Sequence, residues 1–182
     1  MLNGISCAMK IIRRPEWLKK KIVFDQGHTT SALLNDLNLN TVCCEAKCPN
    51  ISECFKAKHA TFLILGKYCT RHCQFCNVEK RNPEPPDSSE PKKIALAVKK
   101  LGLQHVVVTS VTRDDLKDGG SSAFSKTIFQ IKKISPKPSI EILIPDFKNN
   151  PQAIKCVVQT KPEINRWITL HKMWGQRTSL TI

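Results

Sequence analysis

The sequence TFLILGKYCTRHCQFCNV, residues 61–78, joins a short apolar run to a loop that contains three cysteines. The run at 61–65 is continuous and short, which is typical of a buried strand. Cys69, Cys73 and Cys76 follow it with the spacing Cys-x3-Cys-x2-Cys. Three thiolates on one loop indicate a metal site.

The same alternation of strand and helix continues downstream. HVVVTSV at 105–111 and SIEILIPDF at 139–147 are two further apolar runs. Each run is followed by an amphipathic segment; one of these places Phe124, Ile128 and Ile131 on a single stripe. Apolar runs that alternate with helices predict parallel strands covered on both faces, so we expect an α/β fold with three consecutive βα units.

Right-handed βαβ connections place all strand-to-helix loops at one end of a parallel sheet, where sites in such folds lie. The cysteine loop, TSVTRDD at 109–115 and PDF at 145–147 are the three loops concerned. We therefore expect them to converge on one candidate pocket.

Three regions differ in character. We predict an N-terminal extension at 1–58, a (β/α) core at 59–164 and a divergent tail at 165–182. The extension begins with a basic arm, RRPEWLKKKI at 13–22, and the tail has no clear period and no acidic residue. With three strands only, the core would keep one open edge.

Composition narrows the class of protein. The 182 residues suit one core with an appendage, and no apolar run reaches the roughly 18 residues of a membrane span. Nine cysteines without a visible secretory signal favour a reducing compartment. The net charge of +14 favours an acidic partner, although scattered lysines also arise from genome composition.

A second cysteine trio lies upstream. TVCCEAKCPNISECF, residues 41–55, spaces Cys43, Cys48 and Cys54 as Cys-x4-Cys-x5-Cys, with Cys44 beside the first. For the downstream trio, a Cys3His zinc site with His72 is one interpretation. An iron–sulfur cube held by three thiolates, with one open iron, is the other.

The downstream trio, with Phe75 directly before the last cysteine, resembles the signature of radical S-adenosylmethionine enzymes, also in its place after a first barrel strand. The upstream trio is similar to the auxiliary-cluster motif of the lipoyl synthase family, and the resemblance runs from about residue 15 to residue 164. Cys44 departs from that family, in which an acidic residue usually holds the position.

This resemblance implies a partial radical S-adenosylmethionine (β/α) barrel with a cysteine-bearing N-terminal extension. It implies two 4Fe–4S clusters, S-adenosylmethionine as cofactor, and the insertion of two sulfur atoms into a protein-bound octanoyl chain by a sulfurtransferase. The metal ligands would be Cys43, Cys48, Cys54, Cys69, Cys73 and Cys76. Because the cofactor carries the chemistry, we assign no catalytic side chain.

The implied partners are octanoylated lipoyl-carrier domains, in the acyl-carrying subunits of 2-oxoacid dehydrogenases and in the H protein of glycine cleavage. An electron donor and an iron–sulfur carrier are implied as well, and we expect no membrane or nucleic-acid partner. The location would be the bacterial cytoplasm, or a mitochondrion or plastid in a eukaryote. The family's Arg-Ser-Ser-Tyr motif, which holds the fourth auxiliary iron, does not occur here, so we expect the C-terminal part of the fold to be missing.

Four side chains are candidate contacts for S-adenosylmethionine: Phe75, Thr109, Ser110 and Glu141. The two hydroxyls follow the second strand, where they would meet the amino-acid end of the cofactor. Glu141 is a strand carboxylate that needs a cationic partner, which an Arg or Lys ion pair would supply equally well.

Two other functions remain open. A methylthiotransferase of RNA would use the positive charge for phosphate contacts. An inactive fragment that binds a metal such as zinc would need no cofactor at all.

Overall fold

A parallel four-stranded sheet in the order β1-β2-β3-β4 forms the centre of the structure. The structure is a computed structural model that describes residues 15, 28–57 and 59–167. The strands are β1 (Ala60–Ile64), β2 (His105–Ser110), β3 (Ser139–Ile144) and β4 (Ile164–Trp167). Within these residues the sheet is open, so the fold is a partial (β/α) barrel, as the sequence predicted.

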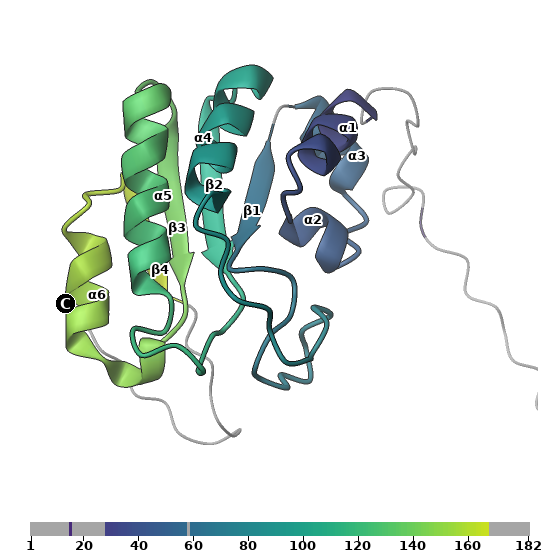
Figure 1. The fold of residues 1–182 in the computed structure, drawn as a ribbon. Helices are drawn as coiled ribbons and strands as arrows, with labels where there is room; N and C mark the ends of the chain where they lie inside the picture. The colour runs from purple at the N-terminus through teal and green to yellow at the C-terminus, as the bar shows by residue number, and fades with distance from the viewer. Residues whose placement is uncertain (1–14, 16–27, 58, 168–182) are drawn as a thin grey trace, which may run out of the picture.

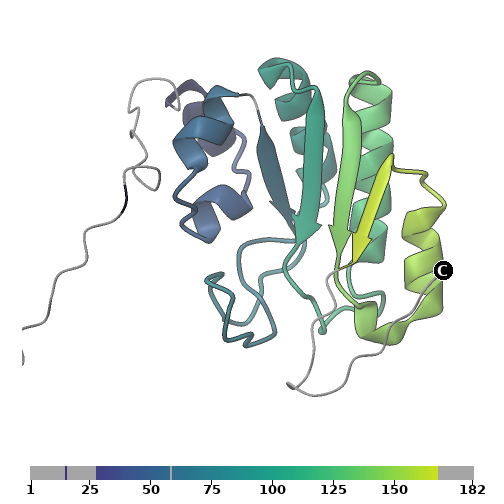
Figure 2. The same cartoon turned by 180° about the vertical axis from the view of Figure 1, so that it is seen from behind.

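The helices between the strands lie on one face of the sheet. These are α4 (Glu90–Leu101), α5 (Ser121–Ile134) and α6 (Pro151–Val158), the last preceded by the short 3-10 helix η2 (Phe147–Asn149). Figure 1 shows α4 and α5 in front of the strands and α6 beside α5, and Figure 2 shows the opposite face of the sheet without a helix in front of it. The expectation of cover on both faces is therefore wrong for the described residues. Successive right-handed crossovers to the adjacent strand place every helix on the same side, as in a barrel.

The core lies between these helices and the sheet. Alternate strand residues point to the helices, because successive side chains in a strand face opposite sides. The fully buried members on the strands are Phe62, Ile64, Val106, Val108, Ile140, Ile142 and Ile144, and those on the helices include Ile94, Val98, Phe124, Ile128 and Val157. This apolar layer fixes the strand register and so the positions of the loops that follow the strands.

Strand β4 is the main addition to the sequence prediction, which ended the core at residue 164. Residues 164–166 are exposed, and the strand pairs with β3 from Glu141↔Ile164 to Ile144↔Trp167. Arg166 Nε also contacts Glu141 Oε1 at 2.6 Å. An edge strand held by backbone pairing needs no apolar run, so hydropathy gives no signal for it.

The N-terminal extension packs beside β1. Its helices are α1 (His28–Asp36), α2 (Val42–Glu45) and α3 (Ile51–Lys56), which Figure 1 shows next to that strand. The Leu63 N–H donates to the Asn40 carbonyl at 2.9 Å, and Thr41 forms an antiparallel bridge with Phe62. The extension thus covers the outer edge of β1.

Two sequence expectations fall on other parts of the chain. The basic arm at 13–22, apart from Pro15, and the tail from 168 to 182 lie outside the described residues. Among the described helices, none has the length and apolar character needed to cross a bilayer.

Candidate metal centre at the carboxyl ends of the strands

The turn that follows β1 is held by two buried charged side chains. Leu65 and Gly66 both have positive φ, 69° and 91°. The Leu65 N–H donates to Glu90 Oε2 at 2.9 Å, and Arg113 Nη1 donates to the Leu65 carbonyl at 3.1 Å. Glu90 is 8% exposed and Arg113 2%. Burial raises the pKa of Glu90, although the N–H groups of Leu65 and Gly66 oppose that rise.

The cysteine loop is then tied to the loop after β2. The Thr70 N–H donates to the Thr112 carbonyl at 3.1 Å, and the Thr70 hydroxyl donates to the same oxygen at 2.9 Å. The Asp114 N–H donates back to Thr70 Oγ1 at 3.2 Å. On the other side, the Cys69 N–H donates to the Glu79 carbonyl at 3.0 Å. The first part of the loop is therefore anchored at both sides.

Arg71 joins all three strand-to-helix loops. Its guanidinium donates to both carboxylate oxygens of Asp114 at 2.7 and 2.8 Å, and to both of Asp146 at 2.7 and 2.8 Å. These residues come from the loops after β1, β2 and β3, so the predicted convergence of the three loops is confirmed. Arg71 carries no functional signal in the sequence, because its carboxylate partners lie 43 and 75 residues further along the chain.

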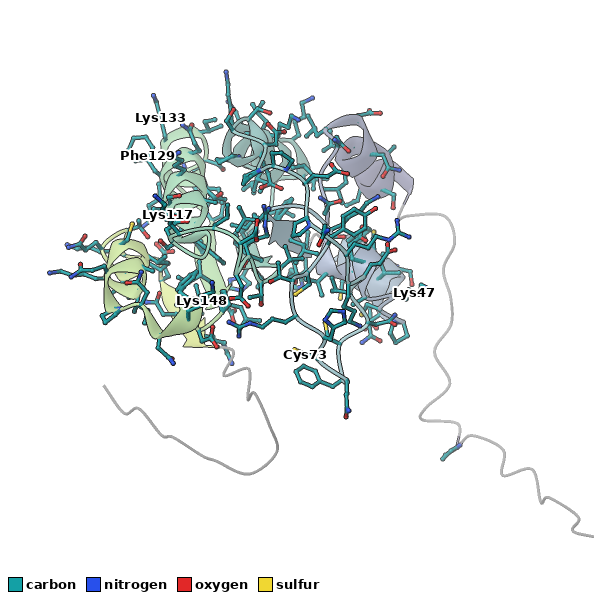
Figure 3. The ribbon with its side chains drawn as sticks, turned by 60° about the horizontal axis from the view of Figure 1, so that its bottom comes forward. Lys47, Cys73, Lys117, Phe129, Lys133 and Lys148 are labelled. Atoms are coloured by element: carbon teal, nitrogen blue, oxygen red, sulfur yellow. The ribbon has the colours of Figure 1, made fainter. Side chains whose placement is uncertain are left out.

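The thiols of Cys69 and Cys76 lie near that of Cys73. Burial raises the pKa of Cys73, and the charges of Cys69 and Cys76 raise it further, whereas Arg71 and Lys80 lower it. The Lys80 ammonium donates to the Cys76 carbonyl at 2.5 Å. Figure 3, which brings the lower side of the Figure 1 view forward, shows Cys73 on a loop between Lys148 and Lys47.

The upstream trio forms a second group. Cys43 is 9% exposed, and its pKa is raised first by burial and also by the charges of Cys48 and Cys54; the Thr61 backbone hydrogen bond opposes this. The Cys48 N–H donates to the Cys43 carbonyl at 3.0 Å. Cys44 is exposed. Its charge also raises the pKa of Cys43, but by less than the charges of Cys48 and Cys54. The thiols of Cys44, Cys48 and Cys54 thus all lie near that of Cys43. The choice of Cys43 over Cys44 as a ligand rests on the family resemblance.

A side-chain hydrogen bond joins the two segments that carry the cysteines. The Asn77 side-chain amide, next to Cys76, donates to the Ala46 carbonyl in the upstream segment at 3.4 Å. The upstream trio lies against β1 through Thr61, and the downstream loop leaves the end of the same strand. The two groups are separate sites along one strand.

The cysteine thiolates of both groups are the kind of ligand that iron–sulfur clusters take. Among the described residues, no three Cys, His, Asp or Glu side chains are arranged to hold a single metal ion. Thiolates bind zinc as well as the irons of an iron–sulfur cube, so the donor types suit either group.

The two predicted hydroxyl contacts lie at the carboxyl end of β2, on opposite faces. Thr109 is buried, and its hydroxyl donates to the Leu143 carbonyl at 2.9 Å. It pairs with Leu63 and Leu143 on the face without helices, whereas Ser110 pairs with Ile64 on the covered face. Ser110 Oγ is buried without a hydrogen-bond partner in the described structure.

The other two predicted contacts have different surroundings. Phe75 is 81% exposed beside Cys76. Glu141 lies in the middle of β3, where its carboxylate contacts His105 Nε2 at 3.0 Å and Arg166 Nε at 2.6 Å. The structure therefore gives Glu141 the ion-pair partner that was the alternative at the sequence level, and it does not place Glu141 with the cysteine loop.

The chain is similar in sequence to lipoyl synthases. It is 52% identical over 153 residues to the lipoyl synthase of Caldanaerobacter subterraneus subsp. tengcongensis, covering 84% of this chain and 54% of the relative. It is 54% identical over 157 residues to that of Geotalea uraniireducens, covering 86% and 56%, and 53% identical over 153 residues to that of Caldicellulosiruptor saccharolyticus, covering 84% and 54%. No protein-family model matches the chain. The chain spans about half the length of the curated relatives it matches.

Proposed function

We propose a function from the premise that the matched part of this chain belongs to the lipoyl synthase family. The chain would form the cluster-binding part of a radical S-adenosylmethionine sulfurtransferase that inserts two sulfur atoms into a protein-bound octanoyl chain. The observation that carries this proposal is the pair of separate thiol groups, one of them placed where three strand-to-helix loops meet.

The downstream site would hold a 4Fe–4S cluster through Cys69, Cys73 and Cys76, and the upstream site would hold a second through Cys43, Cys48 and Cys54. Bound there, the clusters and S-adenosylmethionine would supply the redox and radical chemistry and the sulfur to be inserted.

The protein around the downstream site supplies position and charge. The turn at Leu65 and Gly66 fixes the start of the loop, and Arg71 and Lys80 bring positive charge to thiols that must be deprotonated to bind metal. Around the upstream site, burial of Cys43 against β1 keeps water from one side.

For S-adenosylmethionine, Ser110 is the candidate with a free hydroxyl in the described structure. Thr109 keeps acceptor capacity after its bond to Leu143, and Phe75 offers an exposed ring beside Cys76. Glu141 would have to exchange its contacts with His105 and Arg166 before it could bind a cofactor.

The substrates would be octanoylated lipoyl-carrier domains, and a cytoplasmic location would suit chemistry that depends on reduced thiols. The net charge of +14 favours encounter with acidic carrier proteins, since opposite charge raises association rates. An electron donor and an iron–sulfur carrier would complete the set of partners.

The test is anaerobic purification of the chain followed by iron, zinc and acid-labile sulfide analysis. The proposal expects iron and sulfide equal to two 4Fe–4S clusters per chain, and half of each after Cys73→Ala or after Cys48→Ala. Cys156→Ala, in α6 and outside both trios, is the matched control and should keep both clusters. Zinc without sulfide in the unmodified chain would overturn the proposal.

A further inference from the structure

We propose that Arg71 is a positioning residue that holds the downstream cysteine loop in its ligand-bearing shape before any metal binds. The inference deepens the proposed function, on which its reference to a cluster rests. The statement that Arg71 holds the loop in shape depends only on the contacts of Arg71.

The guanidinium uses its fork to bind two carboxylates at once. Nε and Nη2 donate to Asp114 Oδ2 and Oδ1 at 2.7 and 2.8 Å, while Nη1 and Nη2 donate to Asp146 Oδ2 and Oδ1 at 2.7 and 2.8 Å. All three nitrogens are engaged, and the pairing raises the pKa of Arg71. Paired bidentate contacts fix both distance and orientation, which a lysine ammonium cannot reproduce.

The two carboxylates are themselves held by their loops. The Asp114 N–H donates to Thr70 Oγ1, and the Lys148 ammonium donates to the Asp114 carbonyl. Asp146 Oδ1 accepts from the Lys148 N–H at 3.1 Å, and its side chain caps η2. Arg71 therefore binds two carboxylates in the loops after β2 and β3 whose positions are fixed by further hydrogen bonds.

Arg71 also lies where the anchoring of the loop changes. Before it, Cys69 and Thr70 bond to the backbone of Glu79 and Thr112. After it, the hydrogen bonds of Cys73 and Cys76 are local: the Cys76 N–H donates to the Cys73 carbonyl at 3.2 Å, and the Lys80 ammonium donates to the Cys76 carbonyl. The ion pairs of Arg71 with Asp114 and Asp146, called the clasp below, are the last strong connection of the loop to the loops after β2 and β3 before Cys73.

Such a connection matters because a loop whose shape is held in advance avoids the ordering cost when the metal binds. The contacts of Arg71 fix the segment between Cys69 and Cys73 to the loops after β2 and β3.

The experiment compares Arg71→Lys and Arg71→Gln with Arg81→Lys and Arg81→Gln in the full chain. Arg81 is the matched control, because it pairs with Glu79 at 2.7 Å but is exposed and contacts neither carboxylate of the clasp. Amide hydrogen exchange of metal-free protein is followed at Cys69, Thr70 and Asp114. Both Arg71 variants should exchange about tenfold faster at these amides, and the Arg81 variants should match the unmodified chain.

The second readout is spectroscopic and follows anaerobic reconstitution. The Arg71 variants should bind the downstream cluster less completely and change its EPR signal and reduction potential, with the upstream cluster unchanged. Asp146→Asn keeps the Asp114 pair, and should fall between Arg71→Gln and the unmodified chain in both measurements. It serves as the decisive variant if Arg71→Gln does not fold.

Unchanged exchange and an unchanged EPR signal in the folded Arg71 variants, or in Asp146→Asn, would overturn the inference even if both clusters load. If the unmodified chain binds no iron–sulfur cluster, the proposed function fails, while the exchange result still decides whether Arg71 holds the loop.

Discussion

Replacement of Gly120 by alanine tests the packing that supports the cysteine loop. Gly120 precedes α5 with φ of 93°, and a Cβ added there would lie 2.2 Å from Leu65 Cδ1. Leu65 is 3% exposed and forms the turn after β1. The new methyl group must therefore displace a buried side chain from the turn that begins the loop.

The cost follows from two effects. A positive φ costs a residue with a Cβ about 1–2 kcal/mol, and overpacking of a buried site costs about 1–3 kcal/mol. Gly102, at the end of α4, separates the two, because its φ is 61° and an added Cβ meets nothing within 4 Å. We expect Gly120→Ala to lower the free energy of unfolding by about 2–5 kcal/mol, and Gly102→Ala by about 1–2 kcal/mol.

Urea unfolding followed by circular dichroism measures both changes. The double variant with Leu65→Ala adds a further check, since removal of the Leu65 side chain removes the steric conflict and the two costs should not add. Equal destabilisation by Gly120→Ala and Gly102→Ala, or additive costs in the double variant, would refute the reasoning.

Three further changes test other parts of the structure. Asn150→Ala removes the cap that accepts from the N–H groups of Gln152 and Ala153 at 3.0 and 3.3 Å, and should cost about 1 kcal/mol in urea unfolding; no loss would contradict this capping role. Burial raises the pKa of Glu90, so the folded state binds its proton more tightly and the carboxyl's contribution to stability falls as pH rises above about 4.3. The free energy of unfolding of Glu90→Gln, measured relative to that of the unmodified chain, should therefore increase as pH rises from about 4 to about 7. A relative free energy that decreases over this range would disprove the expectation. Arg166→Gln removes an ion pair whose arginine is 66% exposed, and should cost less than about 1 kcal/mol; a thermal unfolding experiment that gives several times this would show that β4 depends on the pair.

The regular part of the fold was predictable because its signal is local. The apolar runs at Ala60–Ile64, His105–Ser110 and Ser139–Ile144 form strands, and the stripe with Phe124 and Ile128 faces the core. Burial of such runs stabilises the fold wherever they occur in the chain, so sequence pattern alone identifies them. Helix α5 begins at Ser121 directly after Gly120, and Asp118 accepts from the Ser122 N–H at 2.9 Å.

The candidate site also has parts that the sequence could predict and parts that it could not. Cysteine spacing pointed to the downstream trio, because ligands to one cluster from one loop must be close in sequence. The choice of Cys43 over Cys44 in the upstream trio came from the family resemblance. The expected convergence of three loops followed from the handedness of βαβ connections.

Only the tertiary structure could assign partners to the charged residues. Arg71 pairs with Asp114 and Asp146, Glu90 and Arg113 hold Leu65, and Arg166 pairs with Glu141. The sequence determined which segments become strands, helices and thiol groups, since each depends on residues that are neighbours in the chain. The structure decided which charges meet, because an ion pair depends on a distance in space that residues far apart in sequence reach only after the sheet has formed.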